Sequence, residues 1–286
     1  MTQEKPFAIT LDVGSSLANR TGSWRTLRPV YVNRLPPCNA KCPAGEKCRD
    51  WLFLAQSGDY EGAWKEIVED NPFPAVMGRV CYHTCQTACN RGDLDEPVGI
   101  NAVERFLGDH ALKLGWKLPQ PAEEKGKRIL VVGAGPAGLS AAYHLRRMGY
   151  AVHVVESAEA AGGMMRYGIP AYRLPREILD AEIASLLSVG IDAKVNVDIG
   201  DEITFDELRG QYDALYLALG AHTDKKTGIE GEDAEGVISA VEMLREIGDD
   251  HMPDFRGKEI VVIGGGNVAM DVCRSAVRLG ARKVSC

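Results

Sequence analysis

The sequence predicts an α-helical, cysteine-rich domain, then an α/β Rossmann-like domain, then the start of a second α/β unit. Three observations predict this order. Six of the eight cysteines lie between Cys38 and Cys89, in a segment with helical spacing of apolar residues. From Arg128 onward, short β-rich runs alternate with helical runs, which is typical of a parallel sheet with crossover helices. A strand, a glycine turn and a helix are written twice in this second part.

Hydrophobic spacing and helix breakers predict the elements in order. Residues 51–72 predict two short helices separated near Gly58, with Pro72 ending the second, and residues 100–115 predict another helix. Residues 117–127 are rich in proline and charge and predict a linker. Four apolar runs then predict strands: 128–132, 151–156, 213–220 and 259–264.

These elements divide the chain into four expected parts. They are an extended segment (1–37), the helical domain (38–120), the first part of an α/β domain (126–255) and an incomplete second α/β domain (256–286).

Composition excludes several function classes. The formal net charge of −7 disfavours a broad phosphate-binding surface, so we expect no nucleic-acid partner. The N-terminus has no apolar run of signal-peptide length. The longest weakly polar stretch, 129–143, is too short to span a bilayer. We therefore expect a cytoplasmic protein without membrane insertion.

The glycine turn is an internal repeat. Gly133, Gly135 and Gly149 match Gly264, Gly266 and Gly280 without a gap, at an offset of 131 residues. In such a turn the first glycine bends the chain, the second lets the backbone approach a pyrophosphate, and the third packs helix on strand. The helix N-terminus then offers unpaired N–H groups to the phosphates. The alternative is a tight turn that binds nothing.

The first copy predicts a complete dinucleotide site and the second an incomplete one. Glu156, after the second strand, is placed to meet a ribose diol. In the second copy Cys286 corresponds to Val155, so the equivalent of Glu156 would be the next residue. We therefore expect an incomplete form of a longer protein that does not complete hydride transfer. The candidate residues of the two turns are Gly133, Gly135, Pro136, Ala137 and Gly138, then Gly264, Gly266, Asn267, Val268 and Ala269.

Two successive dinucleotide sites suggest FAD and NAD(P)H in a flavin reductase. Disulfide reductases share that plan but need a redox dithiol beside the flavin. No cysteine lies between Cys89 and Cys273, which disfavours that subclass.

The clustered cysteines predict a metal centre. Cytosolic chains rarely keep structural disulfides, so such a cluster more often holds metal. Neither triplet has the C-x2-C rhythm that zinc ribbons favour, whereas Pro43 directly follows Cys42, as is frequent beside [4Fe–4S] ligands. Zinc and unligated thiols remain the alternatives, and we interpret His83 as a hydrogen-bonding neighbour. The two triplets are Cys38, Cys42 and Cys48, and Cys81, Cys85 and Cys89.

From about Pro36 onward the chain resembles a known family. The motifs that carry the likeness include CNAKCP, DNPFPAVMGRVC, INAVER, VVGAGPAGLSAAYHL, GGMMRYGIPAYRLPREIL and VIGGGNVAMD. They resemble the small (β) subunit of bacterial glutamate synthase, the N-terminal half of dihydropyrimidine dehydrogenase, and related NAD(P)H:ferredoxin oxidoreductase subunits. The resemblance implies a helical iron–sulfur domain, then an FAD domain interrupted by an NAD(P)H domain.

The resemblance also implies ligands by position. Cys42, Cys81, Cys85 and Glu104, in INAVER, match the ligands of one [4Fe–4S] cluster. Cys38 and Cys89 match two of the four ligands of another, whose remaining two cysteines have no counterpart before Cys38. One cluster is therefore expected, and two are possible if Cys48 compensates; the alternative for Cys48 is a buried thiol. Without the resemblance, Glu104 would be interpreted as a solvated helix carboxylate.

Flavin contacts are implied in the same way. GGMMRYGIP resembles the segment that lies along the flavin, which makes Gly162, Gly163 and Arg166 candidates, and Gly220 resembles the strand end near the cofactor.

Our functional hypothesis is a flavin- and iron–sulfur-dependent NAD(P)H oxidoreductase subunit. It would exchange electrons with ferredoxin or with a larger catalytic subunit. Redox cofactors would carry the chemistry, and the sequence predicts no acid–base pair or nucleophile. The alternative is a non-catalytic iron–sulfur or zinc scaffold that docks a partner.

Overall fold

A four-stranded parallel sheet forms the framework of the second half of the chain. The computed structural model describes residues 35–121, 123–200 and 203–286. The sheet order is β3-β2-β1-β4, and all three pairings are parallel. Its strands are β1 (Arg128–Val132), β2 (Ala151–Val155), β3 (Ile191–Lys194) and β4 (Ala214–Leu217). The predicted α/β class is confirmed.

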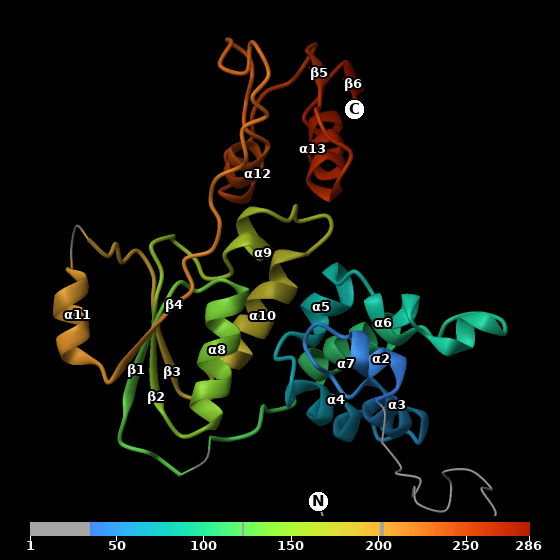
Figure 1. Ribbon diagram of the computed structural model, residues 1–286, viewed down its shortest axis with the longest axis vertical. Coiled ribbons are helices and arrows are strands. Elements are labelled where there is room, and N and C mark those ends of the chain that lie inside the picture. Colours follow the sequence, from blue (N-terminus) through green and yellow to red (C-terminus); the bar gives the residue numbers. More distant parts are fainter. Residues whose placement is uncertain (1–34, 122, 201–202) are drawn as a thin grey trace, which may run out of the picture. The chain divides into compact units, whose positions relative to one another are not determined.

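Helices cover both faces of this sheet (Figure 1). Because side chains alternate along β1, Leu130 and Val132 pack against Leu208, whereas Val131 belongs to the core on the opposite face. The helices of this part are α8 (Pro136–Arg147), α9 (Met164–Tyr167), α10 (Arg176–Leu187) and α11 (Phe205–Gln211).

The cysteine-rich part is helical, as predicted. Its elements are α2 (Pro37–Lys41), α3 (Cys48–Gln56), α4 (Tyr60–Val68), α5 (Pro74–Val80), α6 (Thr84–Thr87), η2 (Asn90–Asp93) and α7 (Ile100–Leu114). The helix expected to end at Pro72 already ends at Val68, because the N–H groups of Asp70 and Asn71 turn back to the Ile67 carbonyl. The segment predicted to be extended, 1–37, lies outside the described residues as far as position 34.

The last part is a smaller α/β unit. It consists of α12 (Ala240–Gly248), β5 (Glu259–Val261), α13 (Asn267–Arg278) and β6 (Lys283–Ser285), and β5 pairs with β6 in parallel. Its buried residues form a small core of their own: Met243, Leu244, Phe255, Val272 and Ala276. In the described part of the chain, no helix combines the length and apolar character needed to cross a bilayer.

One strand was missed from the sequence. The apolar run of β3 is interrupted by Asp192 and Lys194, which are both exposed at the sheet edge. Asp192 Oδ2 lies 3.1 Å from His153 Nδ1 of β2, within hydrogen-bond distance. The strand forms because Ile191 is buried in the main core, a tertiary contact that the local pattern does not predict.

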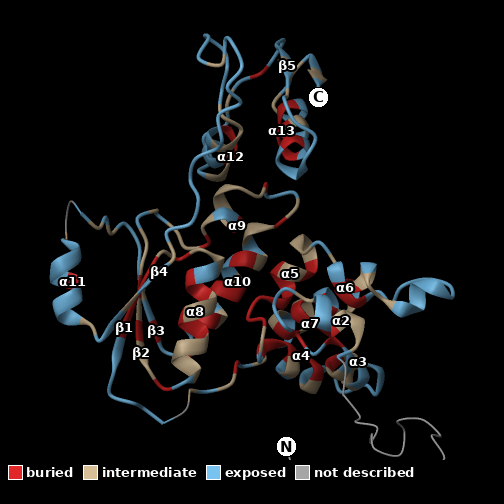
Figure 2. Ribbon diagram, in the orientation of Figure 1, coloured by how far each residue is buried: buried red, intermediate tan, exposed pale blue. Residues whose placement is uncertain are grey.

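A continuous core joins the helical part to the sheet. Buried apolar residues of α3, α4, α5 and α7 pack in one cluster with those of β1, α8, β2 and α10. Figure 2 shows buried residues on all of these elements, whereas most of α11 is exposed. Two polar contacts reinforce this junction: Tyr143 donates to the Val68 carbonyl at 2.9 Å, and Glu182 binds the start of α5.

Glu182 is a carboxylate inside this core. Its two oxygens accept the backbone N–H groups of Ala75 and Val76, at 2.7 and 2.9 Å. These N–H groups belong to the first turn of α5 and have no partner within the helix. Burial raises the pKa of Glu182 to about 8, and the two N–H donors oppose that increase. The side chain of α10 thereby satisfies the N-terminus of α5.

We predict that Glu182→Gln lowers the free energy of unfolding by about 1–3 kcal/mol, because its amide nitrogen would face an N–H donor and leave it unsatisfied. Urea denaturation of both proteins measures the difference. Glu177→Gln, at an exposed position of the same helix, is the control and should change the free energy by less than about 0.5 kcal/mol. Equal effects of the two substitutions would contradict the assigned role of Glu182.

Candidate functional site

The first glycine turn leaves β1 and enters α8 beside β4. Gly133 has a φ of 104°, and a Cβ there would lie 2.3 Å from the Ala218 carbonyl oxygen. Only glycine combines this backbone with so close an approach. Gly138, in the first turn of α8, packs against the turn itself, since a Cβ there would lie 1.9 Å from the Gly133 oxygen. These are the roles that the motif predicts for its first and third glycines.

A cavity of about 480 Å³ opens at this turn, at the carboxyl ends of the strands. Parallel α/β sheets bind ligands at this edge. Seven of the residues predicted to bind the cofactor line the cavity: Gly133, Gly135, Pro136, Ala137, Glu156, Gly163 and Gly220.

Three predicted residues lie outside the cavity lining. Gly138 is buried in helix packing. Gly162 lies against Leu179 of α10, 3.2 Å from where its Cβ would be. Arg166 donates to the Ala161 carbonyl at 2.8 Å and pairs with Asp180. Gly162 and Arg166 shape the segment that carries Gly163.

Glu156 directly follows β2 and forms part of the cavity wall. One carboxylate oxygen accepts the N–H of Ala134 at 2.7 Å, and the other accepts the N–H of Ala158 at 3.0 Å. The side chain thus connects the glycine turn to the end of β2. This is the strand end at which the motif places a carboxylate beside a ribose.

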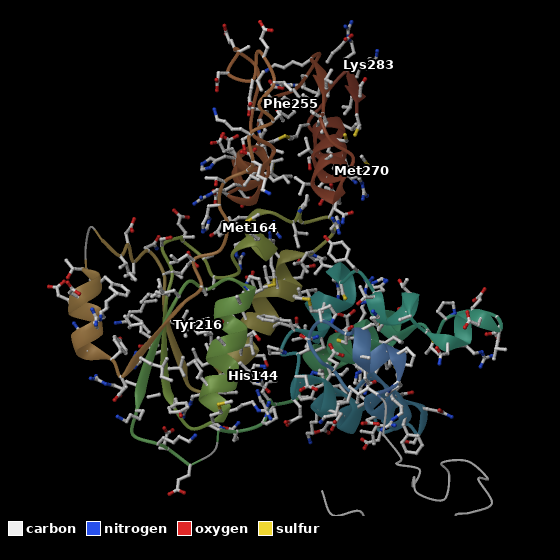
Figure 3. The ribbon with its side chains drawn as sticks, viewed as in Figure 1. His144, Met164, Tyr216, Phe255, Met270 and Lys283 are labelled. Carbon is white, nitrogen blue, oxygen red and sulfur yellow. The ribbon has the colours of Figure 1, made fainter. Side chains whose placement is uncertain are left out.

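Several cavity residues were missed from the sequence. Tyr167 of α9 lines the cavity, and its hydroxyl donates to the Ala160 carbonyl at 3.1 Å. His222 and Arg245 line it from the segments after β4 and within α12. Met164, labelled in Figure 3, also lines it. Tyr167 and Met164 lie in GGMMRYGIP and could have been included, whereas the strand patterns place neither His222 nor Arg245.

The second glycine turn repeats the backbone of the first. Gly264 has a φ of 130°, and Gly266 has φ −83° and ψ −178°, against −76° and −177° for Gly135. Adding the offset of 131 to the bounds of α8 gives the bounds of α13, which confirms the internal repeat. Of the five residues predicted here, Ala269 is buried and Gly264, Gly266, Asn267 and Val268 are exposed.

Helix α13 is tied to the loop between α9 and α10. Arg173 pairs with the buried Asp271 at 2.6 Å, and the Tyr172 hydroxyl donates to the Asp271 carbonyl at 3.3 Å. The guanidinium groups of Arg274 and Arg278 lie 4.7 and 4.0 Å from the centre of the Tyr172 ring. Figure 3 labels Met270 on this helix. The second turn is therefore held to the segment that continues from the cavity wall.

The six clustered cysteines lie at helix ends and in short loops. Cys38 is in α2, Cys42 follows it, and Cys48 begins α3. Cys81 follows α5 directly, and Cys85 lies in the four-residue α6. The second triplet is therefore looped rather than carried on one helix, and His83, between Cys81 and Cys85, has a left-handed φ of 56°, which is uncommon outside glycine. Cys89 precedes η2.

Three thiols of this group meet. Cys48 lies beside both Cys42 and Cys85, and its thiol lowers the pKa of Cys42 to about 6 and that of Cys85 to about 7. Burial raises the pKa of Cys81, to which the charges of Glu104 and Cys85 add. Burial also raises the pKa of Cys38, with a contribution from Cys89. The pKa values of Cys42 and Cys85 are thus lowered toward the thiolate, which is the form that binds metal.

Two carboxylates are buried beside these thiols. Asn71 Nδ2 donates to Glu46 at 2.9 Å and to Glu104 at 3.0 Å, and the second oxygen of Glu46 accepts from Trp51 Nε1 at 3.2 Å. Burial raises the pKa of Glu46 to about 7 and that of Glu104 well above its usual range. Glu104 is 6% exposed, so it is not the solvated helix carboxylate that the sequence alone suggests. Glu46, Asn71 and Trp51 were not predicted; the contacts of Asn71 join residues 25 and 33 positions apart.

Comparison with known proteins identifies the family. The sequence model of a family described as "pyridine nucleotide-disulphide oxidoreductase" matches residues 127–286. The chain belongs to the pyridine nucleotide-disulphide oxidoreductase family. A second description, "dihydropyrimidine dehydrogenase domain II, 4Fe-4S cluster", matches residues 28–116. The disulphide chemistry in the family name needs a redox dithiol beside the flavin, and this chain has no cysteine between Cys89 and Cys273.

Relatives of this oxidoreductase match most of the chain. It is 40% identical to the NADP(+)-dependent formate dehydrogenase subunit beta of Moorella thermoacetica, over 87% of this chain and 38% of that protein. It is 34% identical to the glutamate synthase [NADPH] small chain of Escherichia coli, over 88% and 56%. Among solved structures, Mycobacterium tuberculosis FprA in complex with NADPH matches at 26% identity and a TM-score of 0.47, over 55% and 42%. The chain thus spans 38% of the formate dehydrogenase subunit and 56% of the glutamate synthase small chain.

These findings confirm the resemblance inferred from the motifs and the oxidoreductase class. The site residues also fit the cofactors expected for these families. Gly133 and Gly163 let the turn pack closely against Ala218 and Gly135, and the start of α8 lines the cavity, which suits a dinucleotide pyrophosphate there. The grouped thiols are the donor set that iron–sulfur clusters use.

We predict that Gly163→Ala weakens FAD binding about tenfold or more. Gly163 has a φ of 51° and a ψ of −134°, and a Cβ there would lie 2.7 Å from Gly135 Cα. Strain of about 1–3 kcal/mol at this position would distort the cavity wall. Flavin content after purification and titration of the apoprotein with FAD measure the effect. Gly210→Ala is the control, because a Cβ there meets open space; wild-type FAD affinity in Gly163→Ala would contradict this placement of the flavin.

Proposed function

We propose that this chain is the electron-transfer part of an NAD(P)H-dependent oxidoreductase. FAD binds in the cavity at the first glycine turn, a [4Fe–4S] cluster binds among the clustered cysteines, and NAD(P)H binds at the second glycine turn. The electron partner is ferredoxin or a larger catalytic subunit. The relatives named as subunits of glutamate synthase and formate dehydrogenase support such a partner.

One observation carries this proposal: the cavity and the thiol group are connected by two packed helices. Leu179 of α10 contacts Gly162, next to the cavity residue Gly163. Glu182 of the same helix binds the start of α5, and α5 leads directly into Cys81. Since α5 has seven residues, it is only about 10 Å long. A flavin and a cluster bound here would therefore belong to one rigid assembly.

The residues of the first turn bind and orient the flavin nucleotide. The N–H groups at the start of α8 face the cavity edge and would hold the pyrophosphate. Glu156 would accept the ribose hydroxyls in place of one of its present N–H donors. When bound, FAD converts two-electron into one-electron chemistry. Tyr167 and Met164 of α9 cover part of the cavity and would exclude water from it.

The residues of the second turn position the nicotinamide nucleotide. The start of α13 has the same backbone as the start of α8, so its N–H groups can face phosphates in the same way, and Asn267 adds an N–H that Pro136 lacks. The ion pair between Arg173 and Asp271 keeps α13 at a fixed place relative to the loop that follows α9. We therefore assign residues 126–255 to the FAD-binding domain and 256–286 to the NAD(P)-binding domain.

The helical domain, 38–120, holds the cluster. Cys42, Cys81 and Cys85 supply three thiolates, with Glu104 and Cys48 both beside the fourth position. Cys38 and Cys89 also lie near each other, without two further cysteines in the printed sequence to complete a second set. All eight cysteines are free, which suits a reducing compartment such as the cytoplasm.

The test is anaerobic purification followed by quantification of iron, acid-labile sulfide, zinc and flavin. We expect about four irons, about four sulfides and about one FAD per chain, with visible absorption that dithionite bleaches. Titration with NADPH and with NADH then measures which nicotinamide binds. Zinc without sulfide, in a protein that also lacks flavin, would overturn the proposal and favour a scaffold that docks a partner.

A further inference from the structure

The side chain of Cys48 is buried beside other thiols as well as beside apolar side chains. It is the first residue of α3 and is 1% exposed. Its Sγ, the Sγ of Cys42 and a carboxylate oxygen of Glu46 all lie within 4.8 Å of one another. Its thiol lies beside those of Cys42 and Cys85. Three sulfur atoms from separate segments therefore converge on one point.

The buried carboxylates have other partners. Glu104 is held by the Asn71 amide at 3.0 Å, and Asn71 is itself fixed because its oxygen accepts the Phe73 N–H at 3.0 Å. Glu46 has a hydrogen bond at each oxygen, from Asn71 and from Trp51. Both carboxylates thus belong to a network organised around Asn71. Cys48, in contrast, directs its only polar atom at two candidate ligands.

Iron in a cubane prefers thiolates to carboxylates, which suit harder cations. A fourth thiolate also explains why a thiol is placed against two others in the interior. Cys81, which directly follows α5, has Cys42 and Cys85 as charged neighbours and would complete a set of four.

We propose that Cys48 is a ligand of the [4Fe–4S] cluster, together with Cys42, Cys81 and Cys85, and that Glu104 is a hydrogen-bonded neighbour of the cluster. This rests on the proposed function only in that the chain binds such a cluster. The set differs from the one that the family resemblance implies, in which Glu104 is the fourth ligand.

The test compares Cys48→Val with Glu104→Leu. Valine has nearly the volume of cysteine and keeps the packing, but it cannot bind iron. We expect Cys48→Val to contain roughly tenfold less iron and sulfide than the wild type after anaerobic purification, and Glu104→Leu to retain most of both. Cys273→Val, in α13, is the control for the loss of a cysteine outside the cluster and should match the wild type. Far-ultraviolet circular dichroism checks that each variant is folded.

A second measurement does not depend on variants. Mössbauer spectra of the wild-type protein loaded with ⁵⁷Fe report the ligands of each iron. Four sulfur-ligated sites would support the proposal even if Cys48→Val failed to fold, and one distinct oxygen-ligated site would overturn it. Full iron content in folded Cys48→Val would also overturn it, while leaving the proposed function intact. A wild-type protein without iron would instead remove the proposed function itself.

Discussion

The contact between Glu182 and the start of α5 is the constraint on which the arrangement of the two sites depends. A carboxylate buried in the core is unfavourable unless hydrogen-bond donors compensate for its lost hydration. The unpaired N–H groups of Ala75 and Val76 need an acceptor for the same reason. Each group therefore satisfies the other, and the pairing fixes α5 on α10. Because Cys81 directly follows α5 and α10 packs on Gly162, this contact positions the thiols relative to the cavity.

The thiol site depends on a second network of buried polar groups. Asn71 links Glu46 of the α2–α3 loop to Glu104 of α7, and the Trp51 indole binds Glu46 from α3. In a low dielectric, such hydrogen bonds hold side chains in defined positions because leaving any of them unpaired is costly. The network thereby holds the loop with Cys42 and the start of α3 with Cys48. Thr84 adds a bond to the Lys41 carbonyl at 2.8 Å, which brings α6 and Cys85 to the same place.

The two glycine turns show how similar local sequences acquire different surroundings. Their backbones agree closely, as the nearly identical angles of Gly135 and Gly266 show. The first turn lies in the middle of a four-stranded sheet, with β2 and β4 on either side of β1, and a cavity forms where these strands end. In the described residues β5 has only β6 beside it, and the second turn is exposed. Adjacent strands, rather than the motif itself, make the cavity walls.

Much of the local structure of this protein can be predicted from the sequence alone. Alternating apolar runs with glycine turns fixed the strands at 128–132 and 151–155, because steric limits on Gly133 and the pairing of β1 with β2 leave little freedom. The cysteine spacing predicted a metal site, because few other roles need six thiols in one segment. Tertiary structure alone decided which groups meet. The deciding contacts join residues 6 to 107 positions apart. They are the hydrogen bond of Asn71 to Glu104, the binding of Glu182 to the start of α5, and the contacts of Cys48 with Cys42 and Cys85. No local pattern encodes such contacts, because they arise only when the helices pack and every buried polar group must find a partner.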